Sequence, residues 1–144
     1  MPEHEDNRYA ALVDRTPPEP PPPSALPAGA LDAIRDLRKG DCLSASARLR
    51  ATRRGIPEHV DLRLLEGAAF VCMGDGPEAI DAVEVLKGKV SGGEVSWTLG
   101  RAHLLLGQPK AARRYLLTVV RDDTALRGRA QALLDRIAEV DAEC

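Results

Sequence analysis

The pattern that decides the fold lies in the stretch LGRAHLLLGQPKAARRYL, residues 99–116. Two helix-forming runs are separated by Gly107, and Ala112 follows this glycine five residues later. Glycine favours the left-handed turn that ends a helix, and proline is tolerated at the first position of the next helix, as at Pro109. The stretch therefore predicts two antiparallel helices joined by a short turn.

The same spacing occurs three times, at intervals of 34 and 33 residues. Each copy has a glycine, an alanine five residues later and an apolar residue four residues after that: Gly40, Ala45 and Leu49; Gly74, Ala79 and Val83; Gly107, Ala112 and Leu116. Seven residues before the turn glycine stands a small residue: Ala33, Gly67 or Gly100. A small residue midway along the first helix lets its backbone approach the alanine of the second helix, and the apolar residue fills the gap between neighbouring copies.

This period and these positions resemble the tetratricopeptide (TPR) family. The resemblance covers about residues 26–126, and residues 124–141 resemble the last, capping helix of such arrays. It implies an all-α fold, an α-solenoid of three antiparallel helix pairs in a right-handed superhelix plus a final helix. A generic helical bundle is the alternative. Between the glycine and proline breakers, the predicted helices are 27–39, 42–54, 58–73, 77–88, 94–106, 109–121 and 124–141.

The resemblance also implies a concave groove, lined by the first helix of each pair, that binds an extended peptide or a helix of another protein. On the family's frame the groove-facing positions are Ala30, Ile34, Leu37, Arg38, Asp61, Leu64, Ala68, Val71, Cys72, Glu94, Trp97, Arg101, Leu104 and Leu105. Trp97 and Arg101 are the sharpest pair, because an i, i+4 spacing puts them on one helical face, where the guanidinium can lie against the indole. Two interpretations of Trp97 remain open, a core residue or an exposed groove anchor. Arg101 fits an ion pair or a ligand contact equally well.

Length and composition predict one helical domain preceded by a tail. The chain has 144 residues, 44% of them hydrophobic and only 3% aromatic, which disfavours β-sandwiches and barrels. Residues 1–25 form the predicted tail, disordered or extended, and residues 26–144 the helical repeat domain. Six prolines between Pro17 and Pro23 predict a stiff polyproline II linker. Upstream, Tyr9, Ala10, Leu12 and Val13 fit either disorder or one amphipathic turn that binds a second partner.

The charge pattern gives little support to binding of nucleic acid. The net charge is −2, but residues 26–56 carry seven basic and three acidic groups. Solvated helix faces are the favoured interpretation of this basic block, followed by a docking patch for an acidic partner. Nucleic acid is the least favoured partner, because no recognition-helix pattern accompanies the charge.

The cysteines and the N-terminus predict a soluble protein of the cytoplasm. Cys42, Cys72 and Cys144 are widely spaced and form no C-x-x-C motif, so we expect reduced thiols, with Cys42 and Cys72 acting as small core residues. The first residues do not resemble a secretory leader, and no apolar run is long enough to cross a bilayer. Arginine outnumbers lysine, which suggests a bacterial genome rich in G and C.

No catalytic motif is recognisable, so we expect a non-enzymatic protein with no catalytic residues, metal or cofactor. His59 and His103 lie on predicted helices without a cysteine, serine or aspartate partner in a known arrangement. The leading hypothesis is an adaptor or scaffold that binds another protein in its groove, with a second partner on the tail as an option. The alternative is a dedicated chaperone resembling the three-TPR chaperones of type III secretion translocators. A basic helical module for nucleic acid is a lesser alternative.

Overall fold

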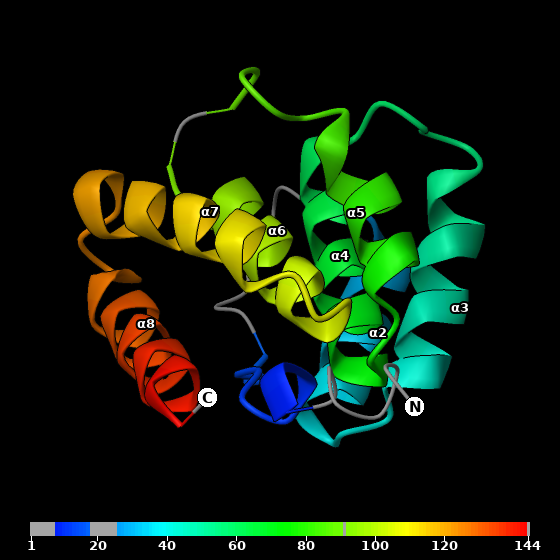
Figure 1. Cartoon of the computed structure of the whole chain (residues 1–144). Helices are drawn as coiled ribbons and strands as arrows, with labels where there is room; N and C mark the ends of the chain where they lie inside the picture. The colour runs from blue at the N-terminus through cyan, green and yellow to red at the C-terminus, as the bar shows by residue number, and fades with distance from the viewer. Residues whose placement is uncertain (1–7, 18–25, 91, 144) are drawn as a thin grey trace.

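The fold is all-helical, as predicted. A computed structural model describes residues 8–17, 26–90 and 92–143, and within these ranges the regular secondary structure is α-helix, with no strand. After a single helical turn at residues 8–10, the helices, labelled as in Figure 1, are α2 (Ala28–Arg38), α3 (Cys42–Arg53), α4 (Val60–Met73), α5 (Gly76–Glu84), α6 (Glu94–Leu105), α7 (Pro109–Asp122) and α8 (Arg127–Ala142).

Most helix ends follow from the residues that predicted them. Gly40, Gly74 and Gly107 adopt φ values of 82°, 79° and 70°, the left-handed region in which a Cβ atom would be strained. The Asp41 carboxylate accepts a hydrogen bond from the backbone N–H of Ser44, so it caps α3. The glycines and the cap therefore fix the turns between paired helices.

Two predicted helix starts are wrong because side chains favour another start. Helix α4 begins at Val60 rather than residue 58, because His59 caps it by accepting a hydrogen bond from the backbone N–H of Leu62. The last helix begins at Arg127 rather than residue 124. The Asp123 carboxylate accepts hydrogen bonds from the backbone N–H groups of Leu126 and Gly93, so it holds a turn that precedes α8.

The close approach of paired helices at small residues is confirmed. A Cβ atom added at Gly67 would lie 2.6 Å from Cγ1 of Val83 and 3.9 Å from the carbonyl oxygen of Ala79. At Gly100 it would lie 3.4 Å from the carbonyl oxygen of Ala112. The paired helices thus meet at the alanine backbone, and the space for a larger residue is closed by the side chains of Val83 and Thr98 at Gly67 and of Leu116 at Gly100, which lie 2.6–3.0 Å from the added atom.

The helices pack in chain order, which is consistent with a solenoid. Each helix packs against the next one along the chain, and α4 also packs against α6, which places the first helices of these two pairs side by side. The buried apolar residues form three clusters, in which the apolar faces of α2–α4, α4–α6 and α6–α8 cover one another in turn. Each pair of helices thus relies on its neighbour to cover its apolar surface.

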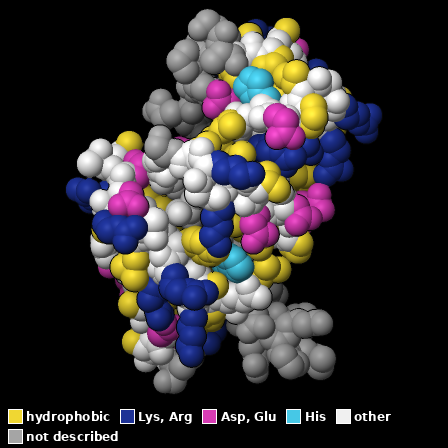
Figure 2. All heavy atoms as spheres, turned by 90° about the horizontal axis from the view of Figure 1, so that it is seen from above, with side chains coloured by type: hydrophobic (Ala, Val, Ile, Leu, Met, Phe, Trp, Pro, Cys, Tyr) yellow, Lys and Arg dark blue, Asp and Glu magenta, His cyan; other side chains and the backbone are white. Residues whose placement is uncertain are grey.

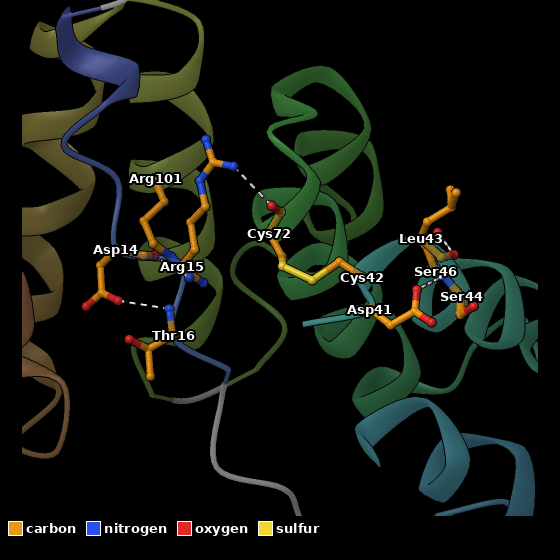
Figure 3. Close-up of a disulfide and its surroundings, with 10 residues drawn as sticks. All are labelled: Asp14, Arg15, Thr16, Asp41, Cys42, Leu43, Ser44, Ser46, Cys72 and Arg101. Atoms are coloured by element: carbon orange, nitrogen blue, oxygen red, sulfur yellow. Dashed lines mark hydrogen bonds between the residues drawn. A yellow bond between two sulfur atoms is a disulfide. The ribbon is translucent and has the colours of Figure 1, made fainter. Parts of the chain in front are cut away.

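The expectation of reduced cysteines is wrong for Cys42 and Cys72, which form a disulfide. Their Cα atoms are 6.0 Å apart, within the range that a disulfide spans. Cys42 begins α3 and Cys72 lies in the last turn of α4, so the bond joins the start of one helix to the end of the next (Figure 3). The two cysteines are 30 positions apart, and no local sequence pattern predicts that they meet.

The helices of the described part of the chain lack the combination of length and apolar character that a membrane span requires.

Candidate functional site

The candidate site is a surface of α4, α6 and α8 that holds residues 8–17 of the same chain. We call these residues the N-terminal segment and the surface the docking face. The segment belongs to the predicted tail, and in Figure 1 it lies, in blue, between α8 and the lower ends of α2 and α4. Its helical turn is followed by residues without regular structure, and Leu12 and Val13 pack against the core clusters. Of the two interpretations of Tyr9–Val13, disorder or an amphipathic turn, the structure shows the turn. The predicted polyproline linker at residues 18–25 lies outside the described residues.

At the centre of the docking face, two arginines stack on one indole ring. The guanidinium carbon of Arg101 lies 4.7 Å from the ring centroid of Trp97, and that of Arg129 lies 5.2 Å from it. Both distances suit cation–π interactions. Arg101 and Trp97 are four residues apart on α6, and Arg129 reaches the ring from α8, so the stack joins the two helices.

Asp14 is the residue of the segment that engages both arginines. Its carbonyl oxygen accepts a hydrogen bond of 3.1 Å from Nη1 of Arg101, and its Oδ2 accepts one of 3.0 Å from Nε of Arg129. Oδ1 accepts a hydrogen bond from the backbone N–H of Thr16, which fixes the turn after Asp14 (Figure 3). Burial raises the pKa of the Asp14 carboxyl, but the hydrogen bonds from Arg129 and Thr16 outweigh burial and lower the pKa to about 2.

The two ends of the segment are held by different helices. Near its start, the Tyr9 hydroxyl donates a hydrogen bond of 2.6 Å to the Asp141 carboxylate near the end of α8. Near its end, Nη1 of Arg15 donates one of 3.1 Å to the carbonyl oxygen of Cys72 in the last turn of α4 (Figure 3). A cation at this position is favourable because the carbonyl groups at a helix C-terminus carry partial negative charge.

Arg101 is almost fully buried, and its contacts explain how the charge is tolerated. The residue is 3% exposed, and burial lowers the pKa of its guanidinium to about 10, which leaves it protonated at neutral pH. Its Nε donates to the carbonyl oxygen of Trp97 at 3.3 Å, and the nearby charges of Glu94 and Asp14 favour the protonated form. The docking face therefore presents a fixed cation to the backbone of the segment.

A pocket of about 320 Å³ continues the docking face beyond Thr16. Its lining residues are Thr16, Glu94, Trp97, Arg101, Asp123, Ala125, Leu126 and Arg129. Burial raises the pKa of the Glu94 carboxyl, although the charge of Arg101 partly offsets this effect. The Glu94 carboxylate makes no hydrogen bond to any residue that the structure describes. The pocket thus holds an acid that could accept a hydrogen bond.

The residues predicted to face a groove divide into three groups. Trp97 and Arg101 lie under the segment but are 2% and 3% exposed, so neither offers free surface while the segment is in place. Six lie in the buried core of the helical stack: Ala30, Ile34, Leu37, Ala68, Val71 and Leu104. Arg38 is exposed at the end of α2, and the remaining ones are partly buried: Asp61, Leu64, Cys72, Glu94 and Leu105.

Sequence reasoning missed Asp14, Arg129 and Asp141. Arg129 and Asp141 lie on α8, which the repeat pattern treats only as a capping helix, and Asp14 lies in the predicted tail. The one available signal was the apolar turn at Tyr9–Val13, which is too short to predict where it binds.

A second pocket of about 640 Å³ lies on another part of the surface, between α3, α4 and α5. In it, Arg50 stacks on Phe70 and donates a hydrogen bond to Glu78, and Leu43 at its edge is 68% exposed. No segment of the described chain enters this pocket. Within the described residues, no group of three or more His, Cys, Asp or Glu side chains is arranged to hold a metal ion.

The pKa of Asp14 makes attachment of the segment dependent on pH. With an ordinary pKa of 3.8 and a pKa of about 2 in the folded chain, Asp14 stabilises the attached segment fully above about pH 4. This contribution is lost as the pH falls through about 2. We expect the fluorescence of Trp97, the only tryptophan, to report release of the segment in this range.

The Asp14→Asn variant isolates this titration from those of other carboxyl groups. Its segment should bind more weakly at neutral pH and should lack the part of the fluorescence change that belongs to Asp14. Superimposable titration curves for the variant and the unaltered chain would contradict the contact between Asp14 and Arg129.

The docking face is therefore defined by its geometry: two arginines stacked on the indole of Trp97, apolar clusters that pack against the segment and hydrogen-bonding groups at both ends of the segment. No protein-family model, curated protein or solved structure matches this chain.

Proposed function

We propose that this protein is a non-enzymatic interaction module, an adaptor or scaffold, that binds a segment of another protein on the docking face. The observation that carries the proposal is that this face already holds a ten-residue segment in cis. The segment is held by side chains and by its own backbone, as peptides are held in protein-recognition grooves. A partner with similar chemistry could use the same contacts.

The proposal includes the TPR-like arrangement. Support comes from the repeated glycine–alanine contacts between paired helices and from the packing of α4 on α6. In a TPR-like solenoid the first helices line the concave side, and α4 and α6 are first helices of their pairs. The docking face would then be part of that concave side, with α8 as its far wall.

Binding of nucleic acid receives less support, because ion pairs engage much of the basic block. Four of its arginines pair with acidic residues: Arg35 with Asp32, Arg48 with Asp36, Arg50 with Glu78 and Arg53 with Glu66. On the face shown in Figure 2, lysine and arginine side chains lie among acidic and apolar ones. Neither observation favours a continuous phosphate-binding surface.

A cytoplasmic location remains a prediction, and the Cys42–Cys72 disulfide counts against it. Cytosolic thiols are usually kept reduced, whereas disulfides persist in oxidising compartments. The redox state of Cys42 and Cys72 in cells would decide between the cytoplasm and an oxidising compartment.

Selection of peptides on the full chain tests the proposed function. A protease site inserted among residues 18–25 and cut after purification would leave the segment bound only by its contacts, so peptides could replace it. We expect a random peptide library to yield binders that a free peptide of residues 8–17 displaces. If no binder is recovered, or if none competes with that peptide, the docking face is not a peptide-binding site.

A further inference from the structure

We infer that the partner carries a segment with the pattern of residues 9–15: a tyrosine, two variable residues, two aliphatic residues, an aspartate and an arginine. This inference rests on the proposed function, because it takes the docking face as the place where the partner binds. The partner would displace the N-terminal segment, which occupies the face in the unbound protein. Each position of the pattern follows from a contact of the bound segment.

The tyrosine position is defined by a hydroxyl contact and an apolar one. Tyr9 donates a hydrogen bond to Asp141, which also accepts one of 2.5 Å from Arg113 on α7. The rest of Tyr9 packs against the cluster of α6, α7 and α8. Phenylalanine would keep the packing but would leave Asp141 without one of its donors.

The two aliphatic positions fill the space between the core clusters. Leu12 packs against the cluster of α6–α8, and Val13 packs against this cluster and the cluster of α4–α6. Val13 therefore lies where the apolar surfaces of neighbouring repeats meet. A polar side chain at this position would be buried without a partner.

The aspartate position carries most of the specificity. The backbone carbonyl of Asp14 binds Arg101 and its carboxylate binds Arg129. The docking face therefore recognises both the position of the backbone and the negative charge of the side chain. Nη2 of Arg129 is buried and makes no hydrogen bond to a described residue, so Asp14 satisfies this guanidinium only in part. A partner that offers an acceptor to this nitrogen would gain a hydrogen bond that the cis segment does not make.

The arginine position follows from the end of α4. Arg15 donates to the carbonyl oxygen of Cys72, and its guanidinium lies 3.6 Å from the place of a Cβ atom on Gly74. A cation is favoured beside these terminal carbonyl groups. Arg15 is itself exposed, so we expect this position to contribute less than the aspartate.

The pocket beyond Thr16 indicates how a partner can outcompete the cis segment. Thr16 lines the pocket but is too short to fill its volume of about 320 Å³. Glu94 lies in the same pocket without a hydrogen-bond partner among the described residues. A lysine at the position of Thr16 would add a donor for this carboxylate that the cis segment lacks. We therefore expect the partner to carry a basic residue two positions after its aspartate.

The test measures the affinity of peptides for a full chain in which the N-terminal segment binds the docking face more weakly. The cis segment competes at an effective concentration of about 1 mM, so the receptor is the full chain with Tyr9→Ala and Asp14→Ala, called the open variant. Fluorescence anisotropy would follow a labelled peptide with the sequence of residues 8–17. We expect this peptide to bind, and a scrambled peptide of the same composition not to bind.

Single substitutions in the peptide test the pattern. We expect Asp14→Asn to weaken binding about tenfold, the loss of one charge-assisted hydrogen bond. Tyr9→Phe should weaken it about fivefold, and Thr16→Lys should strengthen it about threefold. If the scrambled and Asp14→Asn peptides bind as tightly as the parent peptide, the pattern is wrong, even where library selection on the cut chain yields competing binders.

Two further measurements keep the inference testable if the open variant fails to fold. The cut chain retains the native segment, and the same peptides should displace it in the same order of affinity. Light scattering of the unaltered chain should show a monomer, because the segment is bound in cis. A stable dimer that exchanges the segment between two copies would overturn the inference, since a second copy would then be the occupant.

Discussion

Replacing Trp97 with alanine is expected to lower the free energy of unfolding by about 3–5 kcal/mol, the usual cost of truncating a large buried aromatic residue. The residue is 2% exposed and belongs to the core cluster of α6, α7 and α8. In the variant, Arg101 and Arg129 also lose the ring on which both stack. The two arginines repel each other, since the charge of Arg129 disfavours the protonated form of Arg101, and the variant removes the ring that stabilises both cations. Urea denaturation followed by circular dichroism measures the loss, and the thermal midpoint should fall by about 10 °C.

Leu117→Ala is the matched control for this truncation. Leu117 lies on α7 and is 53% exposed, so its replacement should change the stability by less than about 0.5 kcal/mol. Trp97→Phe should fall between the two, because a smaller ring remains under the arginines. A loss below about 1 kcal/mol for Trp97→Ala would contradict the buried position of the indole. Because Trp97 supports the fold, substitutions at Asp14 give a cleaner test of the docking face.

The parts of the fold that sequence could predict are those set by local geometry. A turn glycine with positive φ, as at Gly74, acts on a few neighbouring residues, so its position marks the end of a helix. The spacing from Gly67 to Ala79 also predicted a real contact, because two helices of fixed pitch joined by a short turn leave little freedom in register. The i, i+4 spacing likewise predicted that Trp97 and Arg101 share a helical face, and of the two contacts that this allowed for Arg101, with the indole or with a ligand, the structure shows the one with the indole.

The parts that sequence could not predict depend on single contacts between distant residues. Asp14 and Arg129 are 115 positions apart, and one ion pair at that distance leaves no periodic pattern. The burial of Trp97 was undecidable for the same reason, because it depends on α8 and on the N-terminal segment, which the repeat does not include. The apolar residues of the segment form a single run, Tyr9–Val13, which is too short for its pattern to distinguish a bound segment from a disordered one.

The disulfide gives the second large effect: replacing both Cys42 and Cys72 with alanine should lower the free energy of unfolding by about 3.5 kcal/mol. This magnitude follows from the chain entropy that a cross-link over about 30 residues removes from the unfolded state. The bond joins α3 to α4, and these helices share the first core cluster, so unfolding of the first repeat should become easier. Urea denaturation with and without a reducing agent measures the same quantity without substitution.

The unaltered chain under reducing conditions and the double variant should agree in stability, because both lack the cross-link. The Cys144→Ser variant keeps the pair and controls for loss of a cysteine; reduction should still destabilise it. Alkylation of the denatured chain gives an independent count, since one of the three cysteines should react before reduction and all three after it. Three reactive thiols without reductant, or equal stability with and without it, would show that Cys42 and Cys72 are not joined.

The docking face should remain folded when the disulfide is reduced, because Arg101 and Arg129, on α6 and α8, hold Asp14 and stack on Trp97. The hydrogen bond from Arg15 to the carbonyl oxygen of Cys72 lies beside the disulfide, so reduction should loosen the end of the N-terminal segment before its centre.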